Sequence, residues 1–230
     1  MFNADTLSSR ELAGIIDHTF LKPFGTPADI EKLCSEAVQY GFAMVAINPA
    51  ETERCAALLK GTSVRVGAAI GFPLGQMTSA AKAFEIRDAI AKGATEIDMV
   101  INIRDLQAGR DRAVFAELED MGKTCRDAGV ISKVILETCY LSEDEKKRVC
   151  ALAVEARLDF VKTSTGFGTA GATVADVQLM RAAVGPVMGV KAAGGVRDLE
   201  RALAMVRAGA TRIGTSSGIA LVEALKGLGR

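Results

Sequence analysis

Short apolar runs alternate with longer amphipathic segments along the whole chain. The runs are rich in β-branched residues, and several are apolar almost throughout, which is typical of strands covered on both faces. The candidate strands span residues 14–20, 42–48, 64–72, 96–102, 131–138, 158–164, 187–193 and 211–217. The segments between them have the period of helices. The alternation predicts an α/β protein with a parallel sheet.

Several of the amphipathic segments have recognisable ends. Thr26, Ser142 and Thr173 each precede acidic residues in a first helical turn, as N-cap residues do. Glycines follow other helical stretches, where a left-handed residue commonly ends a helix. These glycines are Gly41, Gly93, Gly129 and Gly209. The pattern therefore predicts where the helices begin and end as well as their number.

Eight strand–helix units fit into 230 residues at about 29 residues each, close to the ~30 residues of a right-handed βαβ unit. Such units most simply close into a single-domain (β/α)8 TIM barrel over residues 1–230, with a short N-terminal helix at residues 8–13. The alternative is an open doubly wound sheet, but its GxGxxG marker is missing after the first strand, where residues 17–22 read DHTFLK. We expect one barrel domain.

Composition excludes several classes of protein. Lys and Arg total 28 and Asp and Glu total 28, so the formal net charge of zero offers no footprint for nucleic acid or an anionic membrane. No apolar run approaches the ~20 residues of a membrane span, and residues 1–14 lack the features of a signal peptide. We expect a cytoplasmic protein without nucleic acid or membrane partners.

Cysteine and histidine are poorly placed for metal binding or disulfide formation. The five cysteines contain no CxxC pair, and His18 is the only histidine. The cysteines are Cys34, Cys55, Cys125, Cys139 and Cys150. We expect small buried thiols and no metal.

We expect the interior of the barrel to be apolar and the active site to lie at the carboxyl ends of the strands. Polar residues stand near these ends in five of the predicted strands. They are Asp17, Asp98, Glu137, Lys162 and Lys191. Two inward-facing lysines on neighbouring strands, ~4.8 Å apart, would oppose each other's protonation. Lowering one pKa from ~10.4 towards ~7 raises the neutral fraction at pH 7 from about one in 2,500 to about half. This environment suits a Schiff-base lysine, and the alternatives are solvated lysines or a structural ion-pair network.

Glycine, serine and threonine dominate the loops after the last three predicted strands. These loops contain residues 163–166, 194–198 and 214–218, and the loops after strands seven and eight commonly bind phosphate in this fold. The alternative is that the glycines only permit tight turns. Asp17 and His18 are neighbours on a strand and must face opposite sides, so we expect His18 to be a packing or hydrogen-bonding residue.

Taken together, these motifs resemble the deoxyribose-phosphate aldolase family, a class I (Schiff-base) aldolase family, from about Ile15 to Leu225. The motifs are DHTFLKP at 17–23, GFPLG at 71–75, EIDMVIN at 96–102, KVILET at 133–138, VKTSTGFG at 161–168, VKAAGGVR at 190–197 and RIGTSSG at 212–218. The lysine-containing motifs KTSTGF and KAAGGVR are specific in combination.

The resemblance implies roles for individual residues. Lys162 would form the Schiff base, and Lys191 would lower its pKa and assist proton transfer. Asp98 would work with Lys191 through ordered water, and Asp17 would support this relay. The implied phosphate contacts are Gly166, Gly194, Gly195, Gly214, Ser216 and Ser217.

The resemblance also implies a reaction, the reversible cleavage of 2-deoxy-D-ribose 5-phosphate into D-glyceraldehyde 3-phosphate and acetaldehyde in deoxyribonucleoside catabolism. The partners are then a phosphorylated sugar and acetaldehyde. No metal or other cofactor is implied, because a protonated imine acts as the electron sink. Members are often dimeric, which makes a homodimer the expected assembly.

Two departures from the family pattern accompany the resemblance. Many members have a C-terminal tail with a tyrosine that reaches the phosphate. Residues 227–230 of this sequence read GLGR and contain no tyrosine, so we expect this contact to be absent or replaced. Many also have a cysteine on the second strand where Ala46 stands, and we expect its loss to lessen inactivation by concentrated aldehydes. The other functions consistent with the residues are a different Schiff-base aldolase, a non-catalytic sugar-phosphate sensor and an isomerase.

Overall fold

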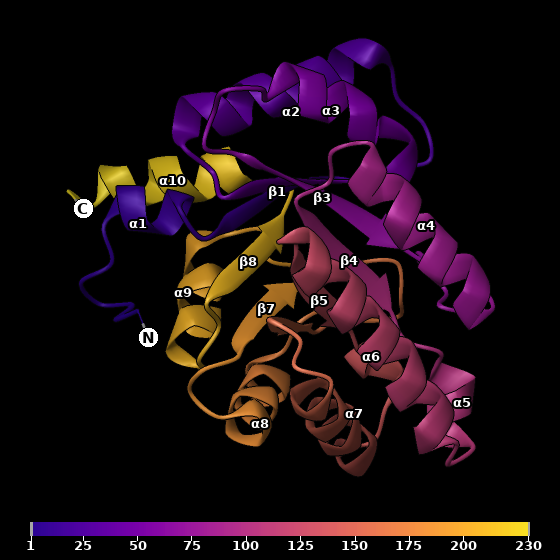
Figure 1. Ribbon diagram of the computed structural model, residues 1–230. Coiled ribbons are helices and arrows are strands. Elements are labelled where there is room, and N and C mark those ends of the chain that lie inside the picture. The colour runs from indigo at the N-terminus through magenta and orange to yellow at the C-terminus, as the bar shows by residue number, and fades with distance from the viewer. Residues whose placement is uncertain (1, 230) are drawn as a thin grey trace.

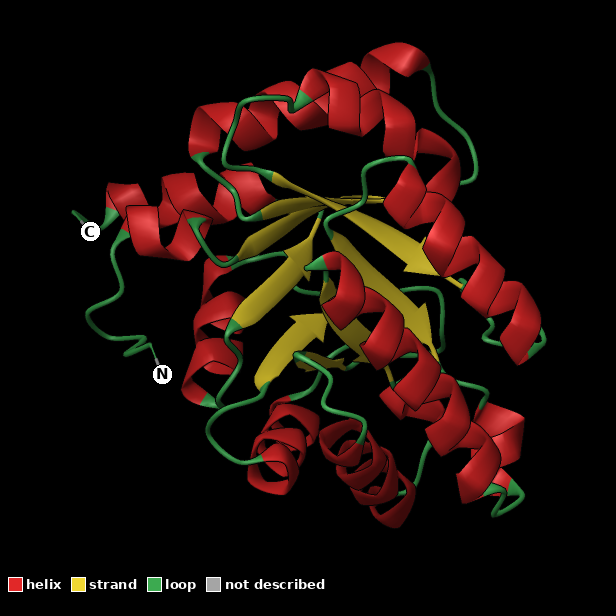
Figure 2. Ribbon diagram, in the orientation of Figure 1, coloured by secondary structure: helices red, strands yellow, loops and turns green. Residues whose placement is uncertain are grey.

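The computed structural model describes residues 2–229, and within them eight parallel strands close into a barrel surrounded by helices (Figures 1 and 2). Each strand pairs with the next in the chain, and β8 pairs with β1. The strands are β1 (Ile16–Phe20), β2 (Met44–Ile47), β3 (Arg65–Ile70), β4 (Glu96–Val100), β5 (Ile131–Ile135), β6 (Phe160–Lys162), β7 (Gly189–Ala193) and β8 (Arg212–Thr215). The predicted TIM barrel is confirmed. Met1 and Arg230, the ends of the expected domain, lie outside the described residues.

Helices follow the strands and cover the outside of the barrel (Figure 2). They are α1 (Ser9–Ala13), α2 (Pro27–Tyr40), α3 (Thr52–Leu58), α4 (Ser79–Ala91), α5 (Ile103–Gln107), α6 (Asp111–Ala128), α7 (Glu143–Glu155), α8 (Val174–Val184), α9 (Leu199–Arg207) and α10 (Gly218–Gly227), with 3-10 turns at Pro49–Glu51 and Thr138–Tyr140. The expected short N-terminal helix is α1, which packs against α10 (Figure 1).

Helix ends lie at the predicted capping residues. The backbone N–H of Ser142 donates to Glu145 Oε2 at 2.7 Å, and Glu145 N–H donates back to Ser142 Oγ at 3.3 Å. Thr173 Oγ1 accepts from the N–H of Asp176 at 3.0 Å, and Thr26 forms a capping box with its own N3 residue. The four predicted helix-terminating glycines all have positive φ, between 66° and 110°. Local sequence thus determines the helix boundaries.

The hydrophobic core lies between the barrel wall and the helices. Successive strand residues face opposite sides of a sheet, and most of those facing outward are apolar. Val45, Ile97, Val134, Val190 and Ile213 are fully buried there against apolar helix residues. Burial of each such side chain stabilises the fold by roughly 1.5–3 kcal/mol.

The inner face of the barrel has a different composition from the expected one. An apolar interior was the sequence-based expectation, and it is wrong. Seven charged residues are buried on the inward-facing strand positions of the described chain. They are Asp17, Glu96, Asp98, Lys133, Lys162, Lys191 and Arg212. The alternation that buries valine and isoleucine outside places these side chains inside.

Candidate active site

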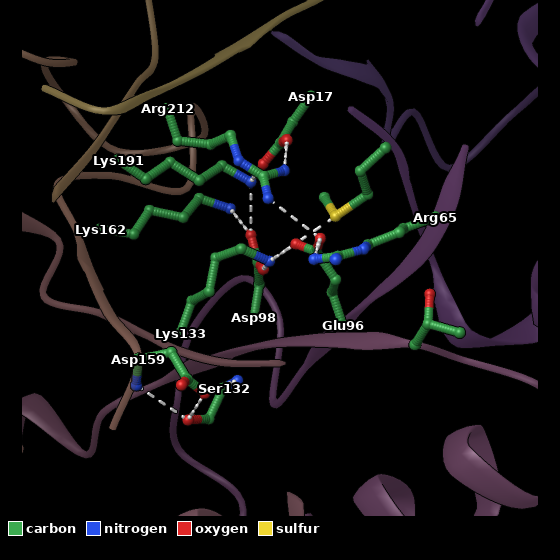
Figure 3. A network of polar contacts seen from close by, with 12 residues as sticks. Asp17, Arg65, Glu96, Asp98, Ser132, Lys133, Asp159, Lys162, Lys191 and Arg212 are labelled. Atoms are coloured by element: carbon green, nitrogen blue, oxygen red, sulfur yellow. Dashed lines mark hydrogen bonds and ion pairs between the residues drawn. The ribbon is translucent and has the colours of Figure 1, made fainter. Parts of the chain in front are cut away.

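Lys162 and Lys191 lie side by side on neighbouring strands. Lys162 ends β6, and its Cα is the register partner of the Lys191 Cα on β7. Both side chains point into the barrel (Figure 3), where they are 3% and 1% exposed. The predicted pairing of the two lysines is confirmed.

Asp98 brings the two ammonium groups to a single oxygen atom. Its Oδ2 accepts from Lys162 Nζ at 2.8 Å and from Lys191 Nζ at 2.7 Å. Asp98 lies in the middle of β4 and not near its carboxyl end as predicted, and it faces both lysines across the barrel interior (Figure 3). Three of the predicted catalytic residues therefore share one contact network.

Asp17 belongs to the same network but does not lie where the sequence placed it. It is the second residue of β1, so its predicted position at the carboxyl end of the strand is wrong. Its fully buried carboxylate pairs with Lys191 at 2.5 Å and also with Arg212. Asp17 therefore lies beneath Lys191, deeper in the barrel, and reaches the site through that lysine.

The surroundings of Lys162 favour its neutral form. Burial lowers the pKa of Lys162 to about 8, and the positive charges of Lys191 and Lys133 act in the same direction against the attraction of Asp98. At pH 7 about one Lys162 side chain in eleven is then a neutral amine, against about one in 2,500 at the ordinary pKa. Although burial opposes ionisation of Asp98, three lysines hold the pKa of its carboxyl well below the usual value. Lys162 is thus a poised nucleophile beside a permanent carboxylate.

Three further charged residues, absent from the sequence-based list, complete this interior network. Lys133 Nζ lies 2.7 Å from Asp98 Oδ1 and also pairs with Glu96. Arg212 pairs with Glu96 at 3.0 Å. Residues two apart on a strand face the same side, so Glu96 must face the barrel interior if Asp98 does. The same spacing on the other strands was the signal that could have identified Lys133 and Arg212 as inward-facing.

A cavity of about 750 Å³ opens above the lysines at the carboxyl ends of the strands. Lys162 and Lys191 line it, whereas Asp17 and Asp98 do not. The six predicted phosphate contacts all line the same cavity, and they are Gly166, Gly194, Gly195, Gly214, Ser216 and Ser217. Gly194 has φ of 85° and lies against Gly171 and Gly166, so only glycine fits at this close approach of two loops. The structure therefore brings the amine and the phosphate loops to one cavity.

Two threonine hydroxyls of the loop after β6 form hydrogen bonds within the protein. Thr163 Oγ1 donates to the carbonyl of Ala193 at 3.0 Å and accepts from its N–H at 3.1 Å. Thr165 bonds Glu137 through both its hydroxyl and its N–H. Glu137, the predicted acid after β5, thus anchors the next loop and makes no ion pair with Lys162 among the described residues. Both hydroxyls and Glu137 therefore hold the loop after β6 in place, and Thr165 also lines the cavity.

His18 and Ala46 occupy opposite faces of the barrel wall. His18 faces outward, where Nε2 lies 2.8 Å from Glu36 Oε2 of α2 and the ring packs on Phe42. This confirms the predicted hydrogen-bonding role. Ala46 is buried on the inner face of β2, opposite Thr19 and Gly67.

Residues 2–229 contain no group of three histidine, cysteine or acidic side chains arranged to hold a metal ion. Nor is any helix of the described chain both long and apolar enough to cross a membrane.

Known proteins resemble this chain over nearly its full length. The model of the DeoC/LacD family aldolases matches residues 12–224. A deoxyribose-phosphate aldolase from Bacteroides thetaiotaomicron is 70% identical over 222 residues, which are 96% of this chain and 93% of that protein. One from Thermococcus gammatolerans is 55% identical over 93% of this chain and 96% of its own. The deoxyribose phosphate aldolase from Aeropyrum pernix, whose solved structure is described as tetrameric, matches with a TM-score of 0.89 and 35% identity, over 96% of this chain and 93% of that one.

Proposed function

The chain belongs to the DeoC/LacD family of aldolases, and from this premise we propose a residue-by-residue account of its activity as a deoxyribose-phosphate aldolase. It reversibly cleaves 2-deoxy-D-ribose 5-phosphate into D-glyceraldehyde 3-phosphate and acetaldehyde. The observation that supports our assignment of residues is that Lys162 and Lys191, which both line one cavity, meet on a single oxygen of Asp98.

Lys162 is the nucleophile in this account. Its neutral amine attacks the C1 aldehyde of the open-chain sugar, and loss of water gives an iminium ion. The iminium then accepts the electron pair of the C2–C3 bond, which breaks as the C3 hydroxyl loses its proton. Glyceraldehyde 3-phosphate leaves, and the two remaining carbons stay on Lys162 as an enamine. Protonation at C2 and hydrolysis release acetaldehyde and regenerate the amine.

Lys191 and Asp98 accept and return the protons that move in this cycle. A group beside Lys162 must take the C3 hydroxyl proton and later return one to C2. Lys191 lines the cavity and shares Asp98 Oδ2 with Lys162, so the pair is placed to do both through an ordered water. Asp17 holds Lys191 from below at 2.5 Å and keeps its ammonium aimed at Asp98.

The phosphate lies at the loops after β6, β7 and β8. Gly166, Gly194 and Gly195 present backbone there, and Gly214 keeps the wall of the cavity open above Lys191. Ser216 and Ser217 stand at the N-terminus of α10, whose free N–H groups and dipole favour an anion. The substrate is thus held between its phosphate at this end and its aldehyde at Lys162.

The protonated imine supplies the electron sink, so the mechanism needs no metal or cofactor. We further propose that residues 1–230 act as one aldolase domain and that the protein is a cytoplasmic homodimer. The dimer is supported by resemblance to the family, and the tetramer described for the relative from Aeropyrum pernix is the competing assembly. Light scattering on the purified protein distinguishes the two, and cell fractionation tests the location.

Reductive trapping tests the nucleophile directly. Wild type and Lys162→Ala are incubated with acetaldehyde and borohydride, and the modified peptide is identified by mass spectrometry. We expect a two-carbon adduct on Lys162 that is absent from the variant. An adduct on Lys191 would reverse the two lysine roles. If folded wild-type protein carries no adduct on either lysine, the Schiff-base mechanism is wrong, and a sensor or an isomerase becomes the better account.

A further inference from the structure

The carboxylate oxygens inside the barrel are each matched to a cation. Asp17 gives one oxygen to Arg212 and the other to Lys191. Glu96 gives Oε1 to Arg212 at 3.0 Å and Oε2 to Lys133. All five side chains are buried, so each pair is shielded from water. Arg212 thus bridges two acids that come from strands on different sides of the barrel.

Asp98 closes these pairs into a continuous ring. Its Oδ1 accepts from Lys133 at 2.7 Å, and its Oδ2 accepts from Lys191 at 2.7 Å (Figure 3). We call the closed circuit of alternating charges the ion-pair ring, which consists of Arg212, Asp17, Lys191, Asp98, Lys133 and Glu96. Among the described residues it holds three acids and three bases, so it is electroneutral by itself.

Lys162 is a cation outside the charge balance of the ring. Its one ion pair among residues 2–229 is with Asp98 Oδ2, an oxygen already taken by Lys191. Protonation of Lys162 therefore places a fourth positive charge beside three negative ones in a region closed to water. Burying an uncompensated charge is costly, and loss of a proton removes the cost.

The other groups that face Lys162 do not supply the missing negative charge. Lys133 and Lys191, on the strands to either side of β6, add positive charge. Glu137 is the remaining buried acid near Lys162, but Thr165 takes both of its oxygens, and burial raises its pKa. On the outer side of β6, α7 packs through the apolar residues Val149, Cys150 and Ala153.

We propose that the ion-pair ring is the device that disfavours protonation of Lys162 and so supplies its neutral, nucleophilic form, and that Glu96 and Arg212 are positioning residues of the reaction although neither lines the cavity. The inference rests on the proposed function of Lys162 as the Schiff-base residue. Glu96 and Arg212 act through the charge count of the ring and touch no substrate.

The pKa shifts of Lys133, Arg212 and Lys162 agree with these different roles. Although burial opposes it, Asp98 and Glu96 raise the pKa of Lys133, and Asp17 and Glu96 raise the pKa of Arg212. Both therefore stay charged when the charge count changes. Lys162, whose pKa is lowered to about 8, is the group that responds.

The proposal is tested by two substitutions that should shift the pH profile of Lys162 in opposite directions. Arg212→Gln leaves two bases against three acids, so the ring favours protonated Lys162 and the pKa of Lys162 rises by about 1. Glu96→Gln leaves two acids against three bases and lowers it by about 1. We expect acetaldehyde trapping, followed against pH, to have its midpoint near 8 in wild type, above 8 in Arg212→Gln and below 8 in Glu96→Gln. At pH 7 Arg212→Gln reacts about tenfold more slowly than wild type and recovers its rate by about pH 10.

Two further variants separate charge from architecture. The double variant Glu96→Gln/Arg212→Gln restores the balance, and its midpoint returns to that of wild type. Arg65→Gln is the matched control, because Arg65 also contacts Glu96, at 3.3 Å, but its side chain is 49% exposed. Solvent screens its charge, and the midpoint stays unchanged.

The outcomes distinguish the inference from the proposed function on which it rests. Absence of a wild-type adduct would contradict the Schiff-base role, whereas an adduct with one common midpoint in every variant would overturn the role of the ring. Acetylation of Lys162 by acetic anhydride, measured against pH by peptide mass spectrometry, gives the same midpoints without any aldolase activity. If Arg212→Gln does not fold, Glu96→Gln still decides, since a midpoint at or above that of wild type contradicts the proposal.

Discussion

A Cβ atom on Gly214 would lie 3.1 Å from Cε of Lys191, because the two residues stand on the neighbouring strands β8 and β7. The same atom would lie 2.9 Å from the Cβ of Ala193. Contacts this short require the neighbours to move: the lysine side chain can swing away, whereas the Cβ of Ala193 moves only with the backbone of β7. The position of the second lysine therefore depends on the absence of a single methyl group.

Gly214→Ala is expected to lower kcat about tenfold, because small displacements of a catalytic group are costly. Lys191 would lose its 2.7 Å contact with Asp98, and the short contact with the Cβ of Ala193 is expected to lower the melting temperature as well. Steady-state kinetics and thermal unfolding measure the two effects. Gly227→Ala in α10 is the control, since nothing lies within 4 Å of its Cβ position. Unchanged kcat in Gly214→Ala would show that Lys191 tolerates the methyl group.

Replacing Lys162 by methionine is expected to stabilise the protein while abolishing activity. The substitution removes the charge that the ion-pair ring leaves uncompensated, which is worth roughly 2–3 kcal/mol at pH 7. Lys133→Met is the matched comparison, because it leaves Asp98 Oδ1 and Glu96 Oε2 without the cation that each of these oxygens contacts. This second change is expected to cost about 3–5 kcal/mol. Urea unfolding of both variants checks the prediction, which fails if the two shift the free energy of unfolding in the same direction.

The gain in Lys162→Met should depend on pH. The pKa of Lys162 is about 8 in the folded protein and ~10.4 in the unfolded chain, so between these values the unfolded chain binds more protons. The stability of wild type should therefore rise with pH in this window, and the advantage of the variant should vanish above about pH 10.4. Parallel unfolding curves from pH 7 to 10 measure the difference. A constant difference across this range would mean that Lys162 is protonated in the folded state throughout.

A second buried ion pair lies outside the barrel wall, between α4 and α6. Lys82 Nζ contacts Glu117 Oε2 at 2.8 Å and the carbonyl oxygen of Val100 at 2.7 Å. Lys82→Met leaves Glu117 buried without a cation and is expected to cost about 3–5 kcal/mol. The double variant Lys82→Met/Glu117→Leu should regain most of this loss. Chemical denaturation tests both, and the pH midpoint of acetaldehyde trapping should match wild type in each.

A negative charge at the phosphate end should weaken substrate binding without changing the amine. Ser216→Asp places a carboxylate in the loop before α10, where it repels the substrate phosphate and competes for the helix N-terminus. We expect KM for 2-deoxyribose 5-phosphate to rise at least about tenfold. Trapping with acetaldehyde, which has no phosphate, should keep its wild-type rate. An equal loss in both assays would place Ser216 elsewhere in the reaction.

Local pattern was sufficient to predict the scaffold. Every strand lies within its predicted run, and Thr26, Ser142 and Thr173 cap helices as expected, because these features depend on neighbours in the chain. The pairing of Lys162 with Lys191 also followed, since consecutive strands of a parallel barrel are adjacent. The count of eight strand–helix units was therefore sufficient to predict most of the fold.

The depth of a residue in the barrel depends on register and could not be predicted in this way. Asp17 was placed at the end of its strand, yet the pairing of β1 with β8 aligns it with Gly214, below the mouth of the cavity. Lys133 and Arg212 had no predicted role. Only the closed barrel shows that they meet acids from distant parts of the chain.

The ion-pair ring also bears on how the protein responds to heat. Charged groups lose hydration free energy as temperature rises, so the cost of holding them away from water falls, while the contribution of apolar burial levels off. The outer core of valine and isoleucine and the inner ring thus respond to warming differently. The ion pairs that hold Lys162 are therefore expected to weaken less on warming than the apolar packing between the barrel wall and the helices.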